Sequence, residues 1–366
     1  MPIYMDLHIV PGVKAQAVAE AHQLDVQVQM EHNCNCMTYW VDEKRGNIFC
    51  LIEAPNQEAV EAMHRQAHGL VPHRIIEVNT GLVEAFLGRI SDPADVILTD
   101  GGLRVFNDAS FRIILLVQVQ DPVLLLHHLG REEAHELTQA CSNDIRQSVV
   151  SNNGSPAAYN GHGYLASFFS ANAAVNCALE IQKKLAGNVG EKAAVKIAVH
   201  AGMPVTENEQ LFGTVIQQAE QLCTVAGINK VAVSEAVQEL LHHDCLESNR
   251  AYLYSLASND ENWLNDLYKV VDANWNDAEF TIADYAMAMA MSQPNFYRKM
   301  MALTGMAPNV FIKDYRLRMA KHLLKKQHCN IAQVTFETGF SSPSYFTKCF
   351  KNRYGLLPNT YTSLLH

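Results

Sequence analysis

The chain has 366 residues, of which 48% are hydrophobic and 18% are charged, and its formal net charge is −10. This length predicts two or three domains, and the composition is that of a globular protein with enough apolar residues for several cores. No apolar run approaches the length of a membrane span and the N-terminus lacks a signal sequence, so we expect a cytoplasmic protein without a membrane partner. The nine cysteines are odd in number and widely scattered, which argues against a disulfide framework.

Residues 1–90 alternate strand and helix patterns in the order β-α-β-β-α-β. The strand patterns lie in PIYMDLHIV, in the two halves of CNCMTYWVDEKRGNIFCLIEAP and in HRIIEV. The helix patterns are AQAVAEAHQLDVQVQMEH and NQEAVEAMHRQAHG, and the second begins at Asn56 and ends at Gly69. This order predicts a ferredoxin-like domain.

Histidine and cysteine side chains gather in this first domain. His64 and His68 are four positions apart on one predicted helix, a spacing at which two imidazoles can share a metal ion. His22 lies on the other helix, His8 on the first strand and Cys50 on the third. These nitrogen and sulfur donors suit nickel, zinc or copper, although a pair of solvated histidines would show the same spacing.

Two further cysteines provide an alternative site. His32, Cys34 and Cys36 alternate at the start of the second predicted strand, so we expect them to share one face there. Cys34 and Cys36 are therefore candidates for an additional soft-metal or redox site. The alternative is that both are structural cysteines in a strand.

The first domain resembles a family of small ferredoxin-like nickel-binding proteins. The matching segments are the opening MPIYMDLH, Ala21-His22, TYWVDE, FCLIEAP and the stretch from His64 to Gly69. The resemblance implies a metal-binding or stress-linked sensory role. Its candidate ligands are His8, His22, Cys50, His64 and His68, whereas the two cysteines at 34 and 36 are not part of the family's pattern.

Residues 91–107 carry Pro, Gly and Asp without a clear period, which predicts a linker. In residues 108–258, strand and helix patterns then alternate throughout. The strand patterns are FRIILLVQVQ, GHGYLASFF, AVKIAVHAGMPV and the start of KVAVSEAVQELL. This alternation predicts a central α/β domain.

The central domain resembles the catalytic domain of the class III nucleotide cyclases. The shared segments are GHGYLASF, ALEIQKKL, VKIAVHAG, FGTVIQQAEQL and VAVSEAVQEL. The resemblance implies where a cyclase would hold its metal ions and its nucleotide, and those positions carry Gln118, Ala158, His162, Gln217 and Gln221. The carboxylate nearest to the first position is that of Asp121, three residues further along the chain.

Loss of these side chains predicts loss of the chemistry. Cyclisation of a nucleoside triphosphate needs two carboxylates for metal ions and a positive group for the developing phosphate charge. Glutamine is neutral and binds hard metal ions poorly, so we predict an inactive domain without a catalytic cofactor. Two roles remain open, namely a scaffold on which two chains pair and a reused cleft for a small ligand such as a nucleotide.

Residues 262–366 contain two blocks of one design. TIADYAMAMAMSQPNFYRKMMALTG and NIAQVTFETGFSSPSYFTKCFKNRYG each predict a short helix, a tight turn and a second helix. Pro294 and Pro343 fall in the first turn of the second helices, and Gly305 and Gly355 are suited to end them. The blocks predict an all-α domain with two helix-turn-helix units.

This region resembles the DNA-binding domain of the AraC/XylS family of transcription regulators, whose C-terminal signature is carried by GFSSPSYFTKCFKNRYGLLPNTY. We expect the second helix of each unit to enter a major groove of double-stranded DNA. Phe296 and Met300, like Tyr345, Phe346 and Phe350, are predicted to face the core. The remaining candidates for DNA contact are Gln293, Asn295, Tyr297 and Arg298 in the first unit and Ser342, Ser344, Thr347 and Lys348 in the second.

The charge distribution agrees with DNA binding at this end of the chain. Residues 262–366 hold 12 Lys and Arg against 7 Asp and Glu, a balance of +5, whereas the rest of the chain carries −15. We therefore predict a multidomain α+β protein that acts as a homodimeric transcription regulator under metal or small-ligand control, and not as an enzyme. The alternatives are a metal-buffering or redox protein with incidental DNA affinity, and an active cyclase.

Overall fold

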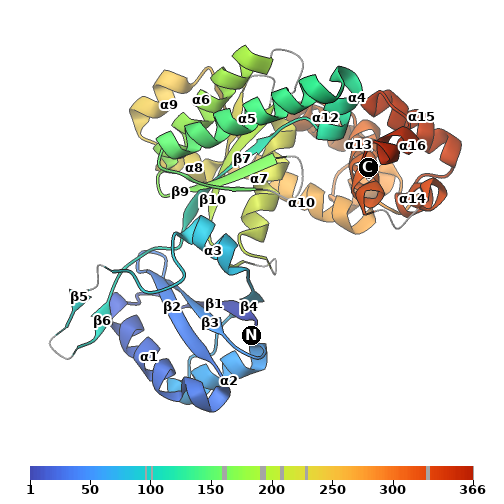
Figure 1. Cartoon of the computed structure of the whole chain (residues 1–366). Coiled ribbons are helices and arrows are strands. Elements are labelled where there is room, and N and C mark those ends of the chain that lie inside the picture. The colour runs from blue at the N-terminus through green and yellow to red at the C-terminus, as the bar shows by residue number, and fades with distance from the viewer. Residues whose placement is uncertain are drawn as a thin grey trace.

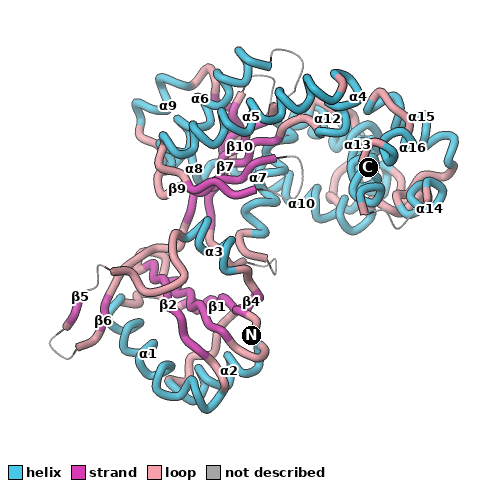
Figure 2. The backbone as a smooth tube through the Cα atoms, viewed as in Figure 1, coloured by secondary structure: helices cyan, strands magenta, loops and turns pink. Residues whose placement is uncertain are grey.

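The computed structural model describes residues 1–94, 97–99, 102–158, 163–189, 195–206, 210–226, 230–326 and 330–365. Figure 1 shows an N-terminal lobe, a central region built on a sheet and a helical C-terminal region beside it. Among the described residues, all strands lie in the first two regions (Figure 2). Among the described helices, none combines the length and the apolar composition needed to cross a membrane. The chain is a multidomain protein with mixed α and β structure, as predicted.

A four-stranded sheet and two long helices form the N-terminal lobe. Its elements are β1 (Ile3–Ile9), α1 (Ala15–Val28), the 3-10 helix η1 (Gln29–His32), β2 (Asn35–Asp42), β3 (Asn47–Glu53), α2 (Gln57–Ala67), β4 (Arg74–Glu77) and then α3 (Thr80–Leu87). The strands pair antiparallel in the order β2-β3-β1-β4. This order, with α1 and α2 as the crossovers, confirms the ferredoxin-like prediction.

Both faces of this sheet are buried, because successive side chains of a strand point to opposite faces. On one face, Cys50 of β3 packs in the same core as Met63 of α2. On the other face, Met5 and Leu7 of β1 pack in the core that contains Phe86 of α3. The strand β1 therefore contributes side chains to the core shared with α1 and α2 on one face and to the core shared with α3 on the other.

Helix α3 attaches the lobe to the central region, after which the hairpin β5 (Ile97–Leu98) and β6 (Arg104–Val105) leads to the central sheet. The guanidinium of Arg112, which is 1% exposed, donates hydrogen bonds to the carbonyl oxygens of Phe86 and Leu87 at the end of α3. The hydroxyl of Ser167 donates to the same Phe86 carbonyl at 3.2 Å. These bonds satisfy carbonyl groups that a helix end leaves without intrahelical partners.

The central region has a six-stranded sheet in the order β12-β11-β10-β7-β9-β8. Its strands are β7 (Arg112–Gln118), β8 (Ser155–Ala158), β9 (Gly163–Phe168), β10 (Lys196–Gly202), β11 (Val231–Val233) and β12 (Leu253–Ser255). Its helices are α4 (Pro122–Leu129), α5 (Arg131–Ser151), α6 (Ala171–Val189), α7 (Gly213–Val225), α8 (Glu235–Leu240) and α9 (His243–Asn249). Helices α5 and α6 cover one face of the sheet and α7 covers the other (Figure 1).

The C-terminal region contains the two predicted helix-turn-helix units. Its helices are α10 (Ser258–Asn274), α11 (Ile282–Ala288), α12 (Gln293–Thr304), α13 (Pro308–Lys325), α14 (Ile331–Glu337), α15 (Pro343–Tyr354) and α16 (Pro358–Ser363). Thr281 and Asn330 form capping boxes at the starts of α11 and α14. Gly305 and Gly355 end α12 and α15 in the left-handed conformation, as the sequence predicts.

The second helix-turn-helix unit is docked on helix α4 of the central region. Val123 and Leu124 of α4 belong to one hydrophobic core with Phe350 of α15. Beside this core, a carboxylate oxygen of the buried Asp121 accepts hydrogen bonds from Lys321 of α13 and from Tyr361 of α16, both at 2.9 Å. The first unit packs separately against α7 of the central region.

Candidate metal centre and nucleic-acid interface

Four buried side chains of the N-terminal lobe bring donor atoms together. Asp6 and His8 come from β1, Cys50 from β3 and His64 from α2, and their donor atoms all lie within 4.8 Å of one another. The backbone N–H of Cys50 donates a hydrogen bond to Oδ1 of Asp6 at 2.9 Å and so fixes the orientation of this carboxylate. Two neighbouring antiparallel strands and a helix packed across them therefore build a compact set of oxygen, nitrogen and sulfur donors.

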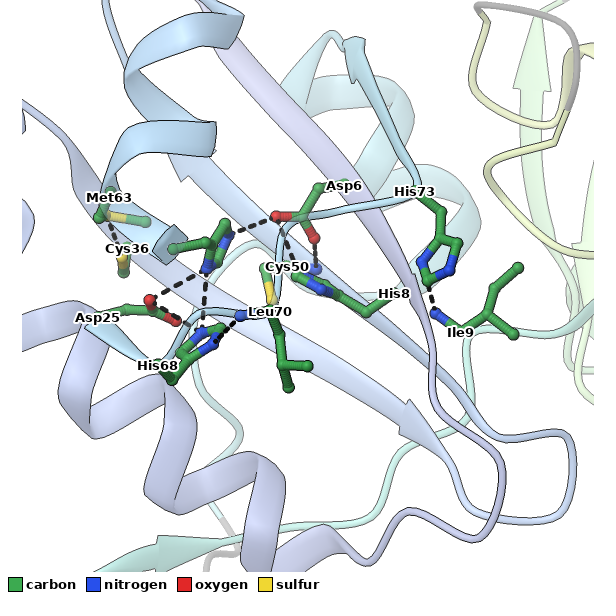
Figure 3. A network of polar contacts seen from close by, with 11 residues as sticks. Asp6, His8, Ile9, Asp25, Cys36, Cys50, Met63, His68, Leu70 and His73 are labelled. Atoms are coloured by element: carbon green, nitrogen blue, oxygen red, sulfur yellow. Dashed lines mark hydrogen bonds and ion pairs between the residues drawn. The ribbon is translucent and has the colours of Figure 1, made fainter. Parts of the chain in front are cut away.

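His64 is the hub of this cluster, because its two ring nitrogens contact different carboxylates. Its Nε2 lies 2.8 Å from Asp6, and its Nδ1 lies 3.0 Å from Asp25 of α1. Nδ1 also lies 3.3 Å from Nε2 of His68, which is itself 3.2 Å from Asp25. Figure 3 shows Asp6 and Asp25 on opposite sides of the network, with His68 beside Asp25.

The two carboxylates control the charge of His64. Burial alone would lower the pKa of His64, but the hydrogen bonds to Asp25 and Asp6 and their negative charges raise this pKa to about 10. Although burial opposes it, the histidines lower the pKa of both Asp6 and Asp25. Burial also raises the pKa of the Cys50 thiol well above its usual range. Without an ion, His64 and Cys50 therefore carry protons, which a metal ion must displace in order to bind.

Of the five predicted ligands, the structure groups His8, Cys50 and His64 with Asp6, and it groups His64 and His68 with Asp25. The fifth, His22, belongs neither to the set around Asp6 nor to the set formed by Asp25, His64 and His68. Its ring packs against that of Tyr39, with 5.1 Å between the ring centroids. It does line a cavity of about 120 Å³ that also reaches the other four.

Sequence reasoning missed the two carboxylates, Asp6 and Asp25. Asp6 is two residues before His8 on the same strand, and Asp25 is three residues after His22 on a helix. In both cases the period of the element places the carboxylate on the face of the neighbouring histidine. That spacing was the available signal.

The alternative pair, Cys34 and Cys36, lies outside this cluster. The prediction that both belong to the second strand with His32 is wrong for two of the three residues. His32 ends the 3-10 helix η1, and the strand β2 begins only at Asn35. The sulfur atom of Cys36 lies 3.6 Å from that of Met63. Burial raises the pKa of the Cys34 and Cys36 thiols, so both thiols stay protonated.

The candidate DNA contacts lie on α12 and α15, except for Ser342, which is the N-cap residue of α15. In the first unit all four candidates, Gln293, Asn295, Tyr297 and Arg298, are exposed, and in the second Ser344 and Lys348 are exposed while Ser342 and Thr347 are half-buried. The Ser342 hydroxyl caps α15 by accepting from the backbone N–H of Tyr345 at 3.3 Å. This cap already uses one lone pair of Ser342 within the protein.

One core prediction in this region is wrong. The helices bury Phe296, Met300, Phe346 and Phe350, but the Tyr345 side chain is 51% exposed. Tyr345 directly precedes the buried Phe346 on the helix, so its side chain falls at the edge of the apolar face. It therefore joins the exposed surface of α15.

Three of the positions singled out by the cyclase resemblance line a cavity of about 290 Å³ between the central region and α13. Gln118, Gln217 and Gln221 lie on its central side, and α13 supplies Arg318 and Lys325 on the other. His162 lies outside the described residues, and the side chain of Ala158 is likewise not among them. No sequence signal indicated that the C-terminal helices would close this cavity.

Two carboxylates that the sequence did not suggest also line this cavity. Glu220 of α7 has a pKa raised to about 7, chiefly by burial. Asp272 of α10 accepts a hydrogen bond from the Gln217 amide at 3.3 Å. Its pKa is also raised by burial. The cavity is therefore polar on both of its sides.

Comparisons with known proteins agree with this layout. Residues 4–78 match the family model described as nickel responsive protein SCO4226-like, and residues 285–363 match that of a helix-turn-helix domain. An uncharacterized HTH-type transcriptional regulator of Haemophilus influenzae is 35% identical over 83 residues, which are 23% of this chain and 28% of that protein. The chain spans 28% to 54% of the lengths of seven curated regulators of transcription or similar proteins and 8% of the length of Histidine kinase P4 of Formosa agariphila.

Solved structures resemble separate parts of the chain. SCO4226 from Streptomyces coelicolor is 35% identical, covers 21% of this chain and 94% of its own, and has a TM-score of 0.20. An adenylate/guanylate cyclase/hydrolase from Silicibacter pomeroyi is 24% identical, covers 38% of this chain and 81% of its own, and has a TM-score of 0.30. The two family models by themselves match a SCO4226-like domain at the N-terminal end of the chain and a helix-turn-helix domain at its C-terminal end.

Proposed function

We propose that the protein is a sequence-specific DNA-binding transcription regulator whose activity is controlled by a transition metal bound in the N-terminal lobe. The observation that carries the DNA-binding part is the pair of helices α12 and α15. Each begins after a tight turn in an AraC-type domain, and each presents exposed polar side chains. Two such helices in one chain suit two successive major-groove contacts.

The donor set of the N-terminal lobe fits a transition metal. In a tetrahedral site with bonds of 2.0–2.3 Å, neighbouring donor atoms lie about 3.3–3.7 Å apart. The Asp6 oxygen lies 2.8 Å from His64 Nε2 and 3.6 Å from His8 Nε2, so small outward shifts would admit an ion. Asp6, His8, Cys50 and His64 would hold it. Nickel is the first candidate, because the lobe matches the nickel-responsive family.

The structure offers a physical route from the metal to the DNA-binding region. Asp6 and His8 alternate along β1 with Met5 and Leu7, which belong to the core that contains α3. The same core continues through α7 of the central region to Phe296 of α12. Because packed cores rearrange between discrete states, a shift of β1 on metal binding can change how the first helix-turn-helix unit is held.

We propose no catalytic activity for the central region. The glutamines at 118, 217 and 221 provide neither the negative charge for two metal ions nor a cation for developing phosphate charge. The test is incubation with ATP or GTP and with Mg²⁺ or Mn²⁺. Cyclic nucleotide in any of these reactions would contradict the proposal. The homodimer and a small-molecule effector, such as a nucleotide in the central cavity, stay predictions from the sequence.

The decisive experiment combines DNA selection with metal removal. Selection from random duplexes should return a consensus sequence, and affinity for that sequence at fixed salt should change when the protein is stripped of metal. Tight metal binding without a consensus would favour a metal-buffering protein instead. A consensus whose affinity ignores metal would move control away from the N-terminal lobe.

A further inference from the structure

Each ring nitrogen of His64 faces its own set of donors. We infer that the N-terminal lobe holds two transition-metal ions, bridged by the imidazole ring of His64. This inference rests on the metal site of the proposed function and extends it to a second ion. The first ion would occupy the set on the Nε2 side, described above. The second would occupy the set on the Nδ1 side, which is formed by Asp25 and His68.

The second donor set is as compact as the first. His64 Nδ1 lies 3.0 Å from Asp25 Oδ1 and 3.3 Å from His68 Nε2, and the third edge, from His68 to Asp25, is 3.2 Å. These three distances are close to the edge of about 3.3 Å expected for nitrogen and oxygen donors at 2.0 Å from an ion. The two nitrogens point away from each other across the ring, so the ions would lie about 6 Å apart.

The buried charges can also be balanced with two ions in place. Asp6 and Asp25 are both almost fully buried, at 0% and 2% exposure, on opposite sides of a single histidine. Two divalent ions carry four positive charges, and the two carboxylates, the Cys50 thiolate and a bridging His64 imidazolate supply four negative charges. A buried site of zero net charge avoids the cost of an uncompensated buried charge. The protons of His64 and Cys50 pass to solvent as the ions bind.

The two sites differ in strength for a structural reason. The first set has four donors that are all buried, whereas the second has three and reaches the half-buried His68. In addition, His68 Nδ1 accepts a hydrogen bond from the backbone N–H of Leu70 at 3.2 Å. Binding through Nε2 requires the proton on Nδ1, so this bond is lost. We therefore expect the second ion to bind more weakly and to keep a coordination position open to water.

The test is metal stoichiometry of the full-length protein, with Ni²⁺ and Cu²⁺ as probes. Elemental analysis after dialysis should find two ions per chain in the wild type and one in Asp25→Asn and in His68→Gln. His22→Gln is the matched control, because that histidine lines the same cavity but belongs to neither set. It should keep two ions, and loss of one would overturn the assignment.

A spectroscopic readout separates bridged ions from independent ones. With two copper ions per chain, the wild type should show a weaker EPR signal than two isolated Cu²⁺ ions, because a bridging imidazolate couples their spins. Asp25→Asn should show the full signal of one ion. Circular dichroism and thermal unfolding establish that each variant is folded.

The possible failures are distinguishable. One ion per chain in the wild type, unchanged in Asp25→Asn and in His68→Gln, would overturn the second ion and leave the proposed metal control intact. Two ions with full, uncoupled signals would overturn the bridge. No bound metal at all would overturn this inference together with the metal part of the proposed function, but not DNA binding.

Discussion

Replacing Asp121 by asparagine should loosen the contact between the central region and the second helix-turn-helix unit. Asp121 is 4% exposed, and one of its oxygens accepts hydrogen bonds from Lys321 and Tyr361 and lies 3.8 Å from the ammonium of Lys325. Its other oxygen accepts from the backbone N–H of Val123 and caps α4. Asparagine keeps the size and an acceptor for the cap, but it removes the negative charge that faces two lysines.

The size of the effect follows from burial. Removing one partner of a fully buried ion pair costs 3–5 kcal/mol, and a hydrogen bond to a charged group contributes about 1.5–3 kcal/mol. The side chains of Lys321 and Lys325 are 14% and 26% exposed, so water compensates part of the loss. We expect about 2–3 kcal/mol for Asp121→Asn, which is about a 30- to 140-fold change in the equilibrium for local opening.

Hydrogen exchange of backbone amides measures this opening directly. Amides of α13 and α16 should exchange about 30- to 140-fold faster in Asp121→Asn, while those of α1 and α2 should not change. Asp266→Asn is the matched control, because Asp266 contacts Lys269 on the surface of one helix, with both side chains more than 60% exposed. Less than a twofold acceleration in α13 and α16 would refute the argument that Asp121 holds the second unit.

Three further predictions concern DNA recognition, pH and the join between the two units. Arg298→Ala should relax specificity at one base pair by about 1–3 kcal/mol, whereas Lys348→Ala should weaken all sequences and reduce the salt dependence by about one charge, as measured by binding titrations. Burial raises the pKa of Glu220 from 4.5 to about 7, so its contribution to stability is complete below pH 4.5 and is lost as pH rises to 7. In thermal unfolding, Glu220→Gln should match the wild type at pH 4.5 and exceed it at pH 8. Arg316 donates to the carbonyls of Trp275, Asp277 and Gly339 at 2.6, 2.7 and 2.9 Å, and Arg316→Lys should lower the urea-unfolding free energy by about 2 kcal/mol.

Each of these predictions has an outcome that would contradict it. Unchanged binding in both DNA-contact variants would mean that α12 and α15 do not enter the grooves. An equal difference between Glu220→Gln and the wild type at both pH values would show that Glu220 does not titrate in this window. Unchanged stability of Arg316→Lys would mean that a single ammonium replaces all three guanidinium contacts.

Much of the fold could be predicted because the relevant signals are local. Helix caps, turns and strand alternation lie within a few residues of one another, and they indicated the ferredoxin-like order and both helix-turn-helix units. In the structure His8, Cys50 and His64 share one donor set, and His64 and His68 share a second. Asp6 and Asp25 were missed because their role as donors in the cluster depends on their burial. That burial results from the packing of a strand against two helices, which the local sequence does not specify.

Contacts between regions gave no local signal. The bond from Lys321 to Asp121 joins residues 200 positions apart, and neither side chain belongs to a pattern that specifies a partner. Tyr345 shows the same limit on a smaller scale, since the residues that pack around its neighbour Phe346 decide which side of α15 is buried. Sequence periodicity gives the width of a helix face only approximately.

The hydrophobic core that runs from Met5 to Tyr315 has a consequence for how this architecture can be divided. Its members come from β1, α3, α7, α12 and α13, so cutting the chain between any two regions exposes apolar surface that was covered by another region. An isolated C-terminal region would expose apolar side chains that α7 covers in the full chain. A chimera that exchanges only the C-terminal region would therefore have to preserve the apolar side chains of α12 that pack against α7.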